Sequence, residues 1–417
     1  MRKICLTVIG LYISFLSAFS QKNRPDTVYT PKPLKVDEVN LISSYYTQEG
    51  NHSAVTGGIG NEHVIDLSTG LEVKFVGWDT QHNKHTLSAE LGFDHHTAAS
   101  SAYVSKTGAS KTGGTRIYPS LNWSVENLKG NSFGIGVYYS HEYNYQSVGL
   151  EVNGSKKLSS NTEINGKVSG FFDRVKMIYP SELIPGTNNN TTGGGYSTYT
   201  TASGRTVTVR DGQEYSDDIP SSARNTFTAS ASLAQIVNKR MQFSVMTDLV
   251  EQTGYLGLPF HRVYFTDGTA HVENLPDNRT KLPLGFRLNY FMGDHFVFRA
   301  YYRYYMDSWG IRSHTADIEI PVKFNSFFSV SPFYRYYTQT AAKYFGAYAT
   351  HTSADTYYTS NFSYSKLNSQ FYGVGIHLAP PKGILNQHLN TLEVRYGHYT
   401  QSTDLYSNVI SFAFTFK

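Results

Sequence analysis

The sequence has little of what many secreted and membrane proteins depend on. Its 417 residues contain one cysteine, Cys5, which excludes disulfide frameworks, zinc fingers and thiol chemistry for the remainder of the chain. Only 16% of the residues are charged, and no basic patch indicates nucleic-acid binding. Beyond the N-terminus, no segment reaches the roughly 18 consecutive apolar residues of a membrane helix, so a helical membrane protein is excluded.

Aromatic residues are abundant instead, with 33 Tyr and 25 Phe, which argues against disorder. The segment 404–417 carries the most informative pattern. In it Ile410, Phe412, Phe414 and Phe416 alternate with Ser411, Ala413 and Thr415. This period predicts a strand with one apolar and one small polar face. An open aromatic edge strand invites aggregation, whereas a closed barrel has no edge. The pattern is therefore typical of an outer-membrane barrel that barrel-assembly machinery inserts.

The N-terminus predicts export. Arg2 and Lys3 precede an apolar stretch, 4–19, and small residues follow before Gln21. These are the parts of a secretory signal peptide, which we assign to residues 1–20. A retained membrane anchor is the alternative, but the stretch is short for a spanning helix. Residues 21–36, which contain proline and lysine, are expected to form a periplasmic leader.

Residues 37–417 predict one barrel domain. Strand after strand alternates apolar with polar residues, as a lipid-facing surface and a wet interior require. We expect an all-β fold, a transmembrane antiparallel up-and-down β-barrel of about 16 strands (range about 14–18) with short periplasmic turns and long extracellular loops. Such a barrel would lie in the outer membrane of a Gram-negative cell, with both termini periplasmic and its outer face in lipid. An array of soluble β-sandwiches is the competing interpretation.

The connections between the predicted strands alternate in length. Long ones are expected near residues 49–61, 98–113, 176–223, 254–278 and 341–366. The longest, 176–223, contains a polar and glycine-rich stretch at 187–203 without periodicity, which predicts a solvated loop or, alternatively, an inward constriction. The glycines at 57–60 favour a tight turn in an outer loop over a phosphate-binding loop, because no strand-to-helix context surrounds them.

Charged residues are expected to line the lumen of the second half. In 295–307 the even positions form a lipid face, so the odd positions face inward. The candidate lumen charges are Arg299, Arg303, Asp307, Asp317, Glu319, Arg335, Glu393 and Arg395. Rows of opposed charge can select solutes by a transverse field. They can also be salt-bridge ladders that stiffen the wall, and both interpretations stay open.

The sequence offers little for catalysis or metal binding. His95 and His96 are adjacent, and adjacent residues of a strand face opposite sides, so they cannot chelate one ion. Asp307 and His314 flank a short turn in which Trp309 is expected to be interfacial. No nucleophile motif is present. We therefore expect no enzyme, no cofactor and no metal, and a rim enzyme would require Asp307 and His314 to converge.

Several stretches resemble a known family. They include VTGGIGNEHV (55–64), LGFDHHTAASS (91–101), FRAYYRYYMDSWGIRSHTADIEIPVK (298–323) and LEVRYGHYTQSTDLYSN (392–408). Together they are similar to the uncharacterised outer-membrane β-barrel family known as domain of unknown function 3570. The resemblance implies a barrel of unassigned activity and transfers no catalytic or binding residue. Genes for flavin-attachment and thioredoxin-like proteins often lie beside those of the family, which implies a link to periplasmic redox proteins.

Three functions follow as hypotheses. The first is a passive channel for a small solute, because a barrel of this size leaves an aqueous lumen unless side chains or loops fill it. The second is a structural, assembly or partner-binding barrel of the cell envelope. The third is the rim enzyme described above. A continuous lumen would favour the first.

Overall fold

A computed structural model describes residues 29–97, 113–183, 196–200, 206–210, 220–384 and 388–417. The signal peptide predicted at 1–20 lies outside these ranges, as do most of the low-complexity stretch at 187–203 and residues 21–28 of the predicted leader. No helix among the described residues is long and apolar enough to cross a membrane. The fold is built from strands.

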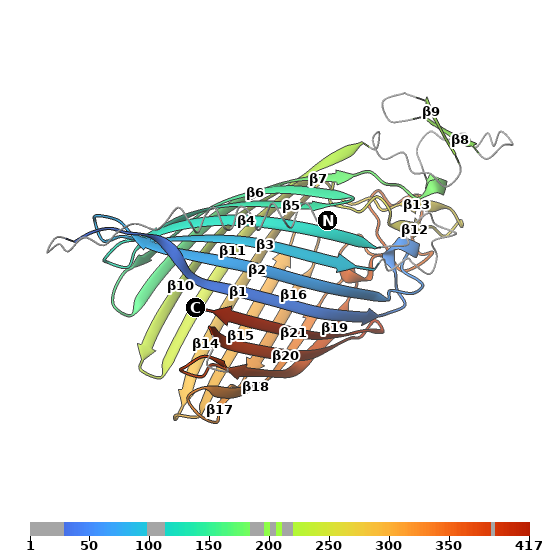
Figure 1. Ribbon diagram of the computed structural model, residues 1–417. Coiled ribbons are helices and arrows are strands. Elements are labelled where there is room, and N and C mark those ends of the chain that lie inside the picture. The colour runs from blue at the N-terminus through green and yellow to red at the C-terminus, as the bar shows by residue number, and fades with distance from the viewer. Residues whose placement is uncertain (1–28, 98–112, 184–195, 201–205, 211–219, 385–387) are drawn as a thin grey trace.

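Sixteen antiparallel strands form a closed barrel, in agreement with the expected fold class (Figure 1). Each pairs with the next along the chain. They are β1 (Lys32–Glu49), β2 (Val64–Trp78), β3 (Lys84–His96), β4 (Gly114–Glu126), β5 (Ser132–Glu142), β6 (Tyr145–Lys157), β7 (Thr162–Lys176), β10 (Ser221–Asn238), β11 (Met241–Gly254), β14 (Asn278–Met292), β15 (Phe296–Asp307), β16 (Arg312–Glu319), β18 (Phe328–Gln339), β19 (Leu367–Leu378), β20 (Leu389–Gln401) and β21 (Leu405–Phe416).

The count of sixteen strands treats β17 (Val322–Lys323) as a continuation of β16. Pro321 precedes β17 and has no backbone N–H to donate to the ladder, so the pairing is interrupted there. Both β16 and β17 pair with β15 on one side and β18 on the other. The first strand begins at Lys32, and it therefore includes the last residues of the segment expected to be a leader.

The barrel closes between β21 and β1. Phe414 lies opposite Leu41 and Ile410 lies opposite Tyr45 in an unbroken antiparallel register. On its other side β21 pairs with β20, where Ser411 and Ala413 lie opposite Arg395 and Glu393. The closing strand thus lies between β20 and β1, and its small inward residues lie beside the long charged ones.

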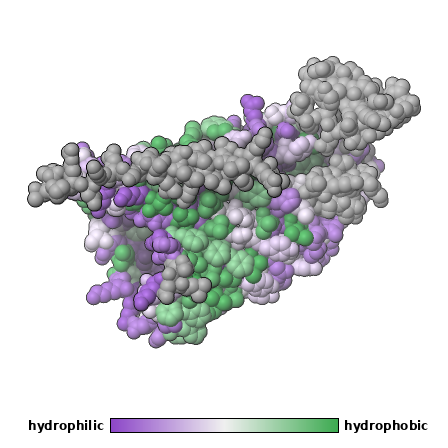
Figure 2. Space-filling view, in the orientation of Figure 1, coloured by the Kyte–Doolittle hydropathy of each residue, from purple (hydrophilic) through white to green (hydrophobic). Residues whose placement is uncertain are grey.

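Side chains alternate between the two surfaces of the barrel as expected. Large apolar residues of the outer surface are exposed on almost every strand, among them Leu91, Ile117, Val137, Leu150, Val168, Phe227, Leu249, Phe286, Ile318, Tyr334, Ile376 and Phe412. Figure 2 shows hydrophobic residues covering the middle of the visible wall, with hydrophilic residues toward one end. An exposed apolar surface of this extent on a closed barrel requires lipid around it.

The two ends of the barrel differ. At the short-turn end, the connections β2–β3, β4–β5, β6–β7, β10–β11, β14–β15 and β16/β17–β18 are compact. Asp79 shows how such a turn is held: its carboxylate accepts hydrogen bonds from the backbone N–H of Gln81 and Asn83, at 2.8 and 2.9 Å. His82 adopts a positive φ of 64° in that turn. Short turns at one end are what the expected fold class requires.

At the opposite, long-loop end, five connections are long, as predicted. Three others are short, because β5–β6, β15–β16 and β20–β21 are tight hairpins. The long connection after β7 contains a short helix, η3 (Ser181–Leu183), and a hairpin of β8 (Tyr196–Thr200) with β9 (Thr206–Arg210). The sequence of that stretch gave no sign of the hairpin.

Three long connections fold together into a compact unit that we call the cap. It comprises 50–63, 255–277 and 340–366, and contains η1 (Ala54–Thr56), β12 (Arg262–Tyr264), β13 (Ala270–Val272) and η5 (Phe362–Tyr364). β12 and β13 lie at the long-loop end of the barrel (Figure 1). Isolated bridges join 255–277 to 340–366, at Phe265 with His351 and at Asn274 with Tyr358. Val263 and Phe265 are buried, so the cap has a small core of its own.

Candidate solute pathway

Arginines dominate one wall of the lumen, formed by β14 to β20. Arg299 and Arg395 both contact the carboxylate of Glu319, each at 2.8 Å, and Arg395 also contacts Glu393 at 3.1 Å. Arg335 pairs with Asp317 at 2.8 Å. The chain of ion pairs favours the stiffening interpretation for these residues. We call the inward face of β14 to β20 the basic wall.

The two partners of an ion pair on the basic wall can differ in how far their side chains are exposed. The side chain of Glu319 is 14% exposed, whereas those of Arg299 and Arg335 are 52% and 50% exposed. Glu319 and Asp317 therefore lie beneath the guanidinium groups of Arg299 and Arg335. Glu393 and Arg395 are about equally exposed, at 35% and 34%. Ion pairs of this kind do not cancel the field that the wall presents, because the positive partner is nearer to the water.

Two arginines of this wall lack a carboxylate partner. Arg303 on β15 forms no ion pair with any residue that the structure describes, and its Nε makes no hydrogen bond. Arg287 on β14 is exposed and its guanidinium lies 5.7 Å from the ring centroid of Tyr301. Arg303 was expected to face the lumen, and its register places it there, opposite Gly285 and Thr315.

The opposite wall, formed by β2 to β6, is acidic. Glu72 accepts a hydrogen bond from Asn40, Glu90 from Ser120 and Asp94 from Tyr118, at 2.8–3.0 Å. All three donors are neutral. Arg116, which lies opposite Asp94 in the register, bonds to Ser140 and forms no ion pair with this carboxylate. We call this inward face the acidic wall. Its carboxylates were not among the candidates from sequence, although the alternation of β3 places Glu90 and Asp94 on the inward side.

The two walls face each other across the barrel. Around the closed ring, β3 and β15 are eight strands apart in either direction, and so are β4 and β16. Glu90 and Arg303 lie near the middles of β3 and β15. The lumen thus carries opposite charge on facing walls, which creates a field transverse to the barrel axis.

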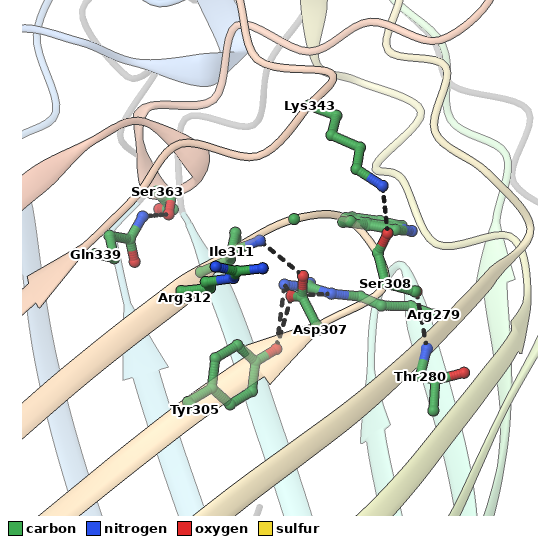
Figure 3. Close-up of polar contacts among 12 residues, drawn as sticks. Arg279, Thr280, Tyr305, Asp307, Ser308, Ile311, Arg312, Gln339, Lys343 and Ser363 are labelled. Carbon is green, nitrogen blue, oxygen red and sulfur yellow. Dashed lines mark hydrogen bonds and ion pairs between the residues drawn. The ribbon is translucent and has the colours of Figure 1, made fainter.

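Asp307 does not contribute to this field, contrary to expectation. Its side chain is 0% exposed and receives two bonds from Arg279, including one of 3.0 Å from Nε. The hydroxyl of Tyr305 donates to the same carboxylate at 2.8 Å, and the backbone N–H of Ile311 donates at 2.9 Å. Figure 3 shows Arg279 and Tyr305 pointing toward Asp307 beneath the β15–β16 turn. Asp307 organises that turn and does not face a solute.

Trp309 and His314 also differ from expectation. Trp309 is 2% exposed, and its Nε1 donates to the backbone oxygen of Asn278 at 2.9 Å. The guanidinium of Arg279 lies 4.4 Å from the centroid of the Trp309 ring. It is an anchor of the turn and not an interfacial residue. His314 lies on the outward face, where its Nδ1 is 2.7 Å from the hydroxyl of Tyr302. Asp307 points inward, so the two cannot converge, and the rim-enzyme hypothesis built on them is wrong.

The cap contains a buried polar cluster. Glu273 accepts hydrogen bonds from the hydroxyl of Thr359 and from the backbone N–H of Leu258, and its Oε2 is 3.4 Å from Nδ1 of His261. Burial opposes ionisation of Glu273, but His261 and these donors together hold its pKa below the ordinary value. The cluster ties 255–277 to 340–366.

A second contact ties the cap to other loops. Arg262 is buried and bonds to Glu182 of η3 at 2.5 Å and to the backbone oxygen of Val55 at 2.7 Å. Gly58 has a φ of 85°, and a Cβ there would lie 2.6 Å from the backbone oxygen of Ser360. The glycine run at 57–60 thus forms the expected tight turn. Its glycines also allow the loop to approach 340–366 closely. Within the described ranges, no group of three or more His, Cys, Asp or Glu could hold a metal ion.

A family match accompanies this geometry. The family described as "Protein of unknown function (DUF3570)" matches residues 98–408, well over half of the chain. The chain belongs to this family. The resemblance seen in the sequence is confirmed, although the match begins after the stretch at 55–64. No curated protein matches the chain.

Solved outer-membrane proteins are similar at low identity. OccD3 (OpdP) of Pseudomonas aeruginosa is 8% identical over 94% of this chain and 95% of its own, with a TM-score of 0.42. OprD of the same species is 7% identical over 93% of each chain, with a TM-score of 0.42. A bacterial polysaccharide outer membrane secretin is 11% identical over 91% of this chain and 98% of its own, with a TM-score of 0.43. The strand pairing described above itself defines the fold.

The closed ladder and the apolar outer surface make this member of the family a transmembrane β-barrel of the outer membrane. A closed barrel satisfies every backbone hydrogen bond between its own strands, which hydrocarbon requires of any structure that spans it. Lipid is therefore one partner of the chain.

Proposed function

We propose that the chain is a passive channel through which small solutes cross the outer membrane. The single observation that carries the proposal is the charge separation in the lumen, with Glu90 and Asp94 on one wall and Arg299, Arg303 and Arg335 on the other. A lumen that only had to be filled would not need exposed charges of opposite sign on facing walls. Barrels of sixteen strands are wide enough to conduct.

The test is single-channel recording in planar bilayers with the purified, folded protein. We expect discrete conductance steps, and we expect Arg303→Glu to change the ratio of cation to anion permeability. Arg240→Glu makes the same change of charge in the exposed β10–β11 turn, away from the lumen, and serves as the matched control. A folded barrel that conducts no ions would favour the alternative, a structural or partner-binding barrel of the envelope.

The orientation is part of the same proposal. Bacterial outer-membrane barrels have short periplasmic turns and longer extracellular loops, so the cap would be extracellular and both termini periplasmic. Cys5 is the only cysteine and lies in the predicted signal peptide, which makes single-cysteine labelling clean. Ser353→Cys in the cap should react with a membrane-impermeant maleimide on intact cells. Ser326→Cys in the β17–β18 turn should react only after permeabilisation, and the reverse pattern would invert the barrel.

A further inference from the structure

Arg303 has a position unlike that of the other arginines on the basic wall. Arg299, Arg335 and Arg395 each hold a carboxylate, whereas Arg303 holds none among the residues described. Asp317, the acidic residue diagonal to it on β16, is already bonded by Nε of Arg335 at 2.8 Å. On the other side of Arg303 stands Gly285, which has no side chain. The local charge around Arg303 is therefore unbalanced.

A second, independent feature lies beside it. Thr315 is directly opposite Arg303 in the β15–β16 register and faces the same inward side. Thr315 is 5% exposed, and its hydroxyl has no hydrogen-bond partner. Buried polar groups in folded proteins are nearly always hydrogen-bonded, and each exception requires an explanation. Here two unpartnered donors, Nε of Arg303 and Oγ1 of Thr315, occur in one cross-strand pair.

The arrangement suits a ligand that accepts hydrogen bonds. Because Nε of Arg303 makes no bond to the wall, the guanidinium can turn toward a ligand without losing one. Arg287, two residues along β14 from Gly285, adds a second guanidinium on the same inward face and has no ion pair with a described residue. Guanidinium groups bind carboxylate and phosphate oxygens in pairs of parallel hydrogen bonds, and a hydroxyl can supply a further donor.

We propose that Arg303, Arg287 and Thr315 form an oxyanion-binding site in the lumen, which takes the carboxylate or phosphate group of a small solute. The proposal rests on the channel function and deepens it, because it names the chemical group that the pathway recognises. Arg303 is the central contact and Arg287 the second cation. Thr315, opposite Arg303 in the register, provides an unpartnered hydroxyl.

Binding can be measured without conductance. The folded barrel in detergent is titrated with ¹³C-labelled acetate and, separately, with inorganic phosphate at constant ionic strength, and ligand line broadening is followed by NMR. We expect saturable binding of at least one oxyanion that chloride does not displace at equal concentration. Arg303→Gln should weaken binding by about tenfold or more, and Arg287→Gln by less. Thr315→Val, which keeps the shape, should also weaken it, while Arg240→Gln in the turn should not.

Heat-modifiable migration on gels verifies that each variant is folded. If Arg303→Gln does not fold, Arg303→Lys keeps the charge and should bind more weakly than the wild type, because an ammonium lacks the planar fork. If acetate binds more tightly than phosphate, the site takes a carboxylate group, and if phosphate binds more tightly, it takes a phosphate group. Equal displacement by chloride, or unchanged binding in the folded Arg303 variants, would overturn the site. A barrel that conducts without binding refutes this site alone, and one that binds without conducting refutes the channel alone.

Discussion

Arg279 and Asp307 form a buried ion pair that joins β14 to the end of β15. Arg279 bonds to Oδ2 of Asp307 through both Nε and Nη2, and the carboxylate side chain is fully covered. The same guanidinium lies over the ring of Trp309. Arg279, Asp307 and Trp309 thus form one buried cluster. It holds the tight β15–β16 hairpin at the long-loop end of the barrel.

Removal of one partner from this pair should destabilise the barrel strongly. Asp307→Asn leaves the buried guanidinium of Arg279 without a counter-charge, and breaking a buried pair in this way costs about 3–5 kcal/mol. Asp317→Asn is the matched control, because its partner Arg335 is half exposed and such pairs contribute about 0–1 kcal/mol. Urea unfolding in lipid vesicles compares the two. Equal losses of unfolding free energy would contradict the structural role of Asp307.

Periodicity was enough to predict which way Asp307 points but not what covers it. Alternation along 295–307 correctly places Asp307 on the inward face, because strand geometry is local. Its burial depends on Arg279, 28 residues earlier in the chain, and on the tight turn that brings Trp309 over the guanidinium. Neither contact has a local sequence signal. Trp309 was therefore misassigned to the interface.

The same distinction holds for the rest of the molecule. The closed all-β architecture and the side of most wall residues were predictable, because alternation repeats around the barrel. The cap was not, because its cluster joins His261 and Glu273 of one loop to Thr359 of another. The acidic wall was not predicted for another reason. Alternation places Glu90 on the inward face, but the sequence does not show that β3 faces the arginines of β15 across the lumen.

Acidification should loosen the cap. Because the pKa of Glu273 is lowered in the folded protein, the stability it contributes is present above the pKa of the unfolded chain and is lost as the pH falls through the folded value. The ordinary value is 4.5, so the loss begins below about pH 4.5. The ring centroids of Trp309 and Tyr364 of the cap are 5.6 Å apart, so the fluorescence of Trp309 reports on the packing of the cap. With Trp78 and Trp123 replaced by Phe, its fluorescence should change over this range.

Glu273→Gln provides the control for that measurement, because the amide keeps the shape but does not titrate. In this variant the acid transition of Trp309 fluorescence should disappear, and the cap should be loosened already at neutral pH. A transition of the same midpoint in the Gln variant would assign the pH dependence to another group.

A charge on the outer surface should destabilise the barrel, whereas the same residue inside should not. Val168 is exposed on the outer surface near the middle of β7, and Val168→Arg should cost about 2–4 kcal/mol, the range for arginine at the bilayer midplane. Ser230→Arg is the control on the adjacent strand, because Ser230 lies opposite Lys167 on the inward face. Unfolding in vesicles measures both. Equal tolerance of the two would mean that Val168 does not face lipid.

The two walls should act on permeant ions with opposite sign. Glu90→Gln removes negative charge from the acidic wall, so the reversal potential in a KCl gradient should shift toward anion selectivity. Arg303→Gln removes positive charge from the facing wall and should shift it toward cation selectivity. The double variant should lie between the single variants. Since the screening length falls from about 10 Å in 0.1 M salt to about 3 Å in 1 M, both shifts should shrink at high salt. Shifts of the same sign would show that permeant ions do not sense the walls as facing charges.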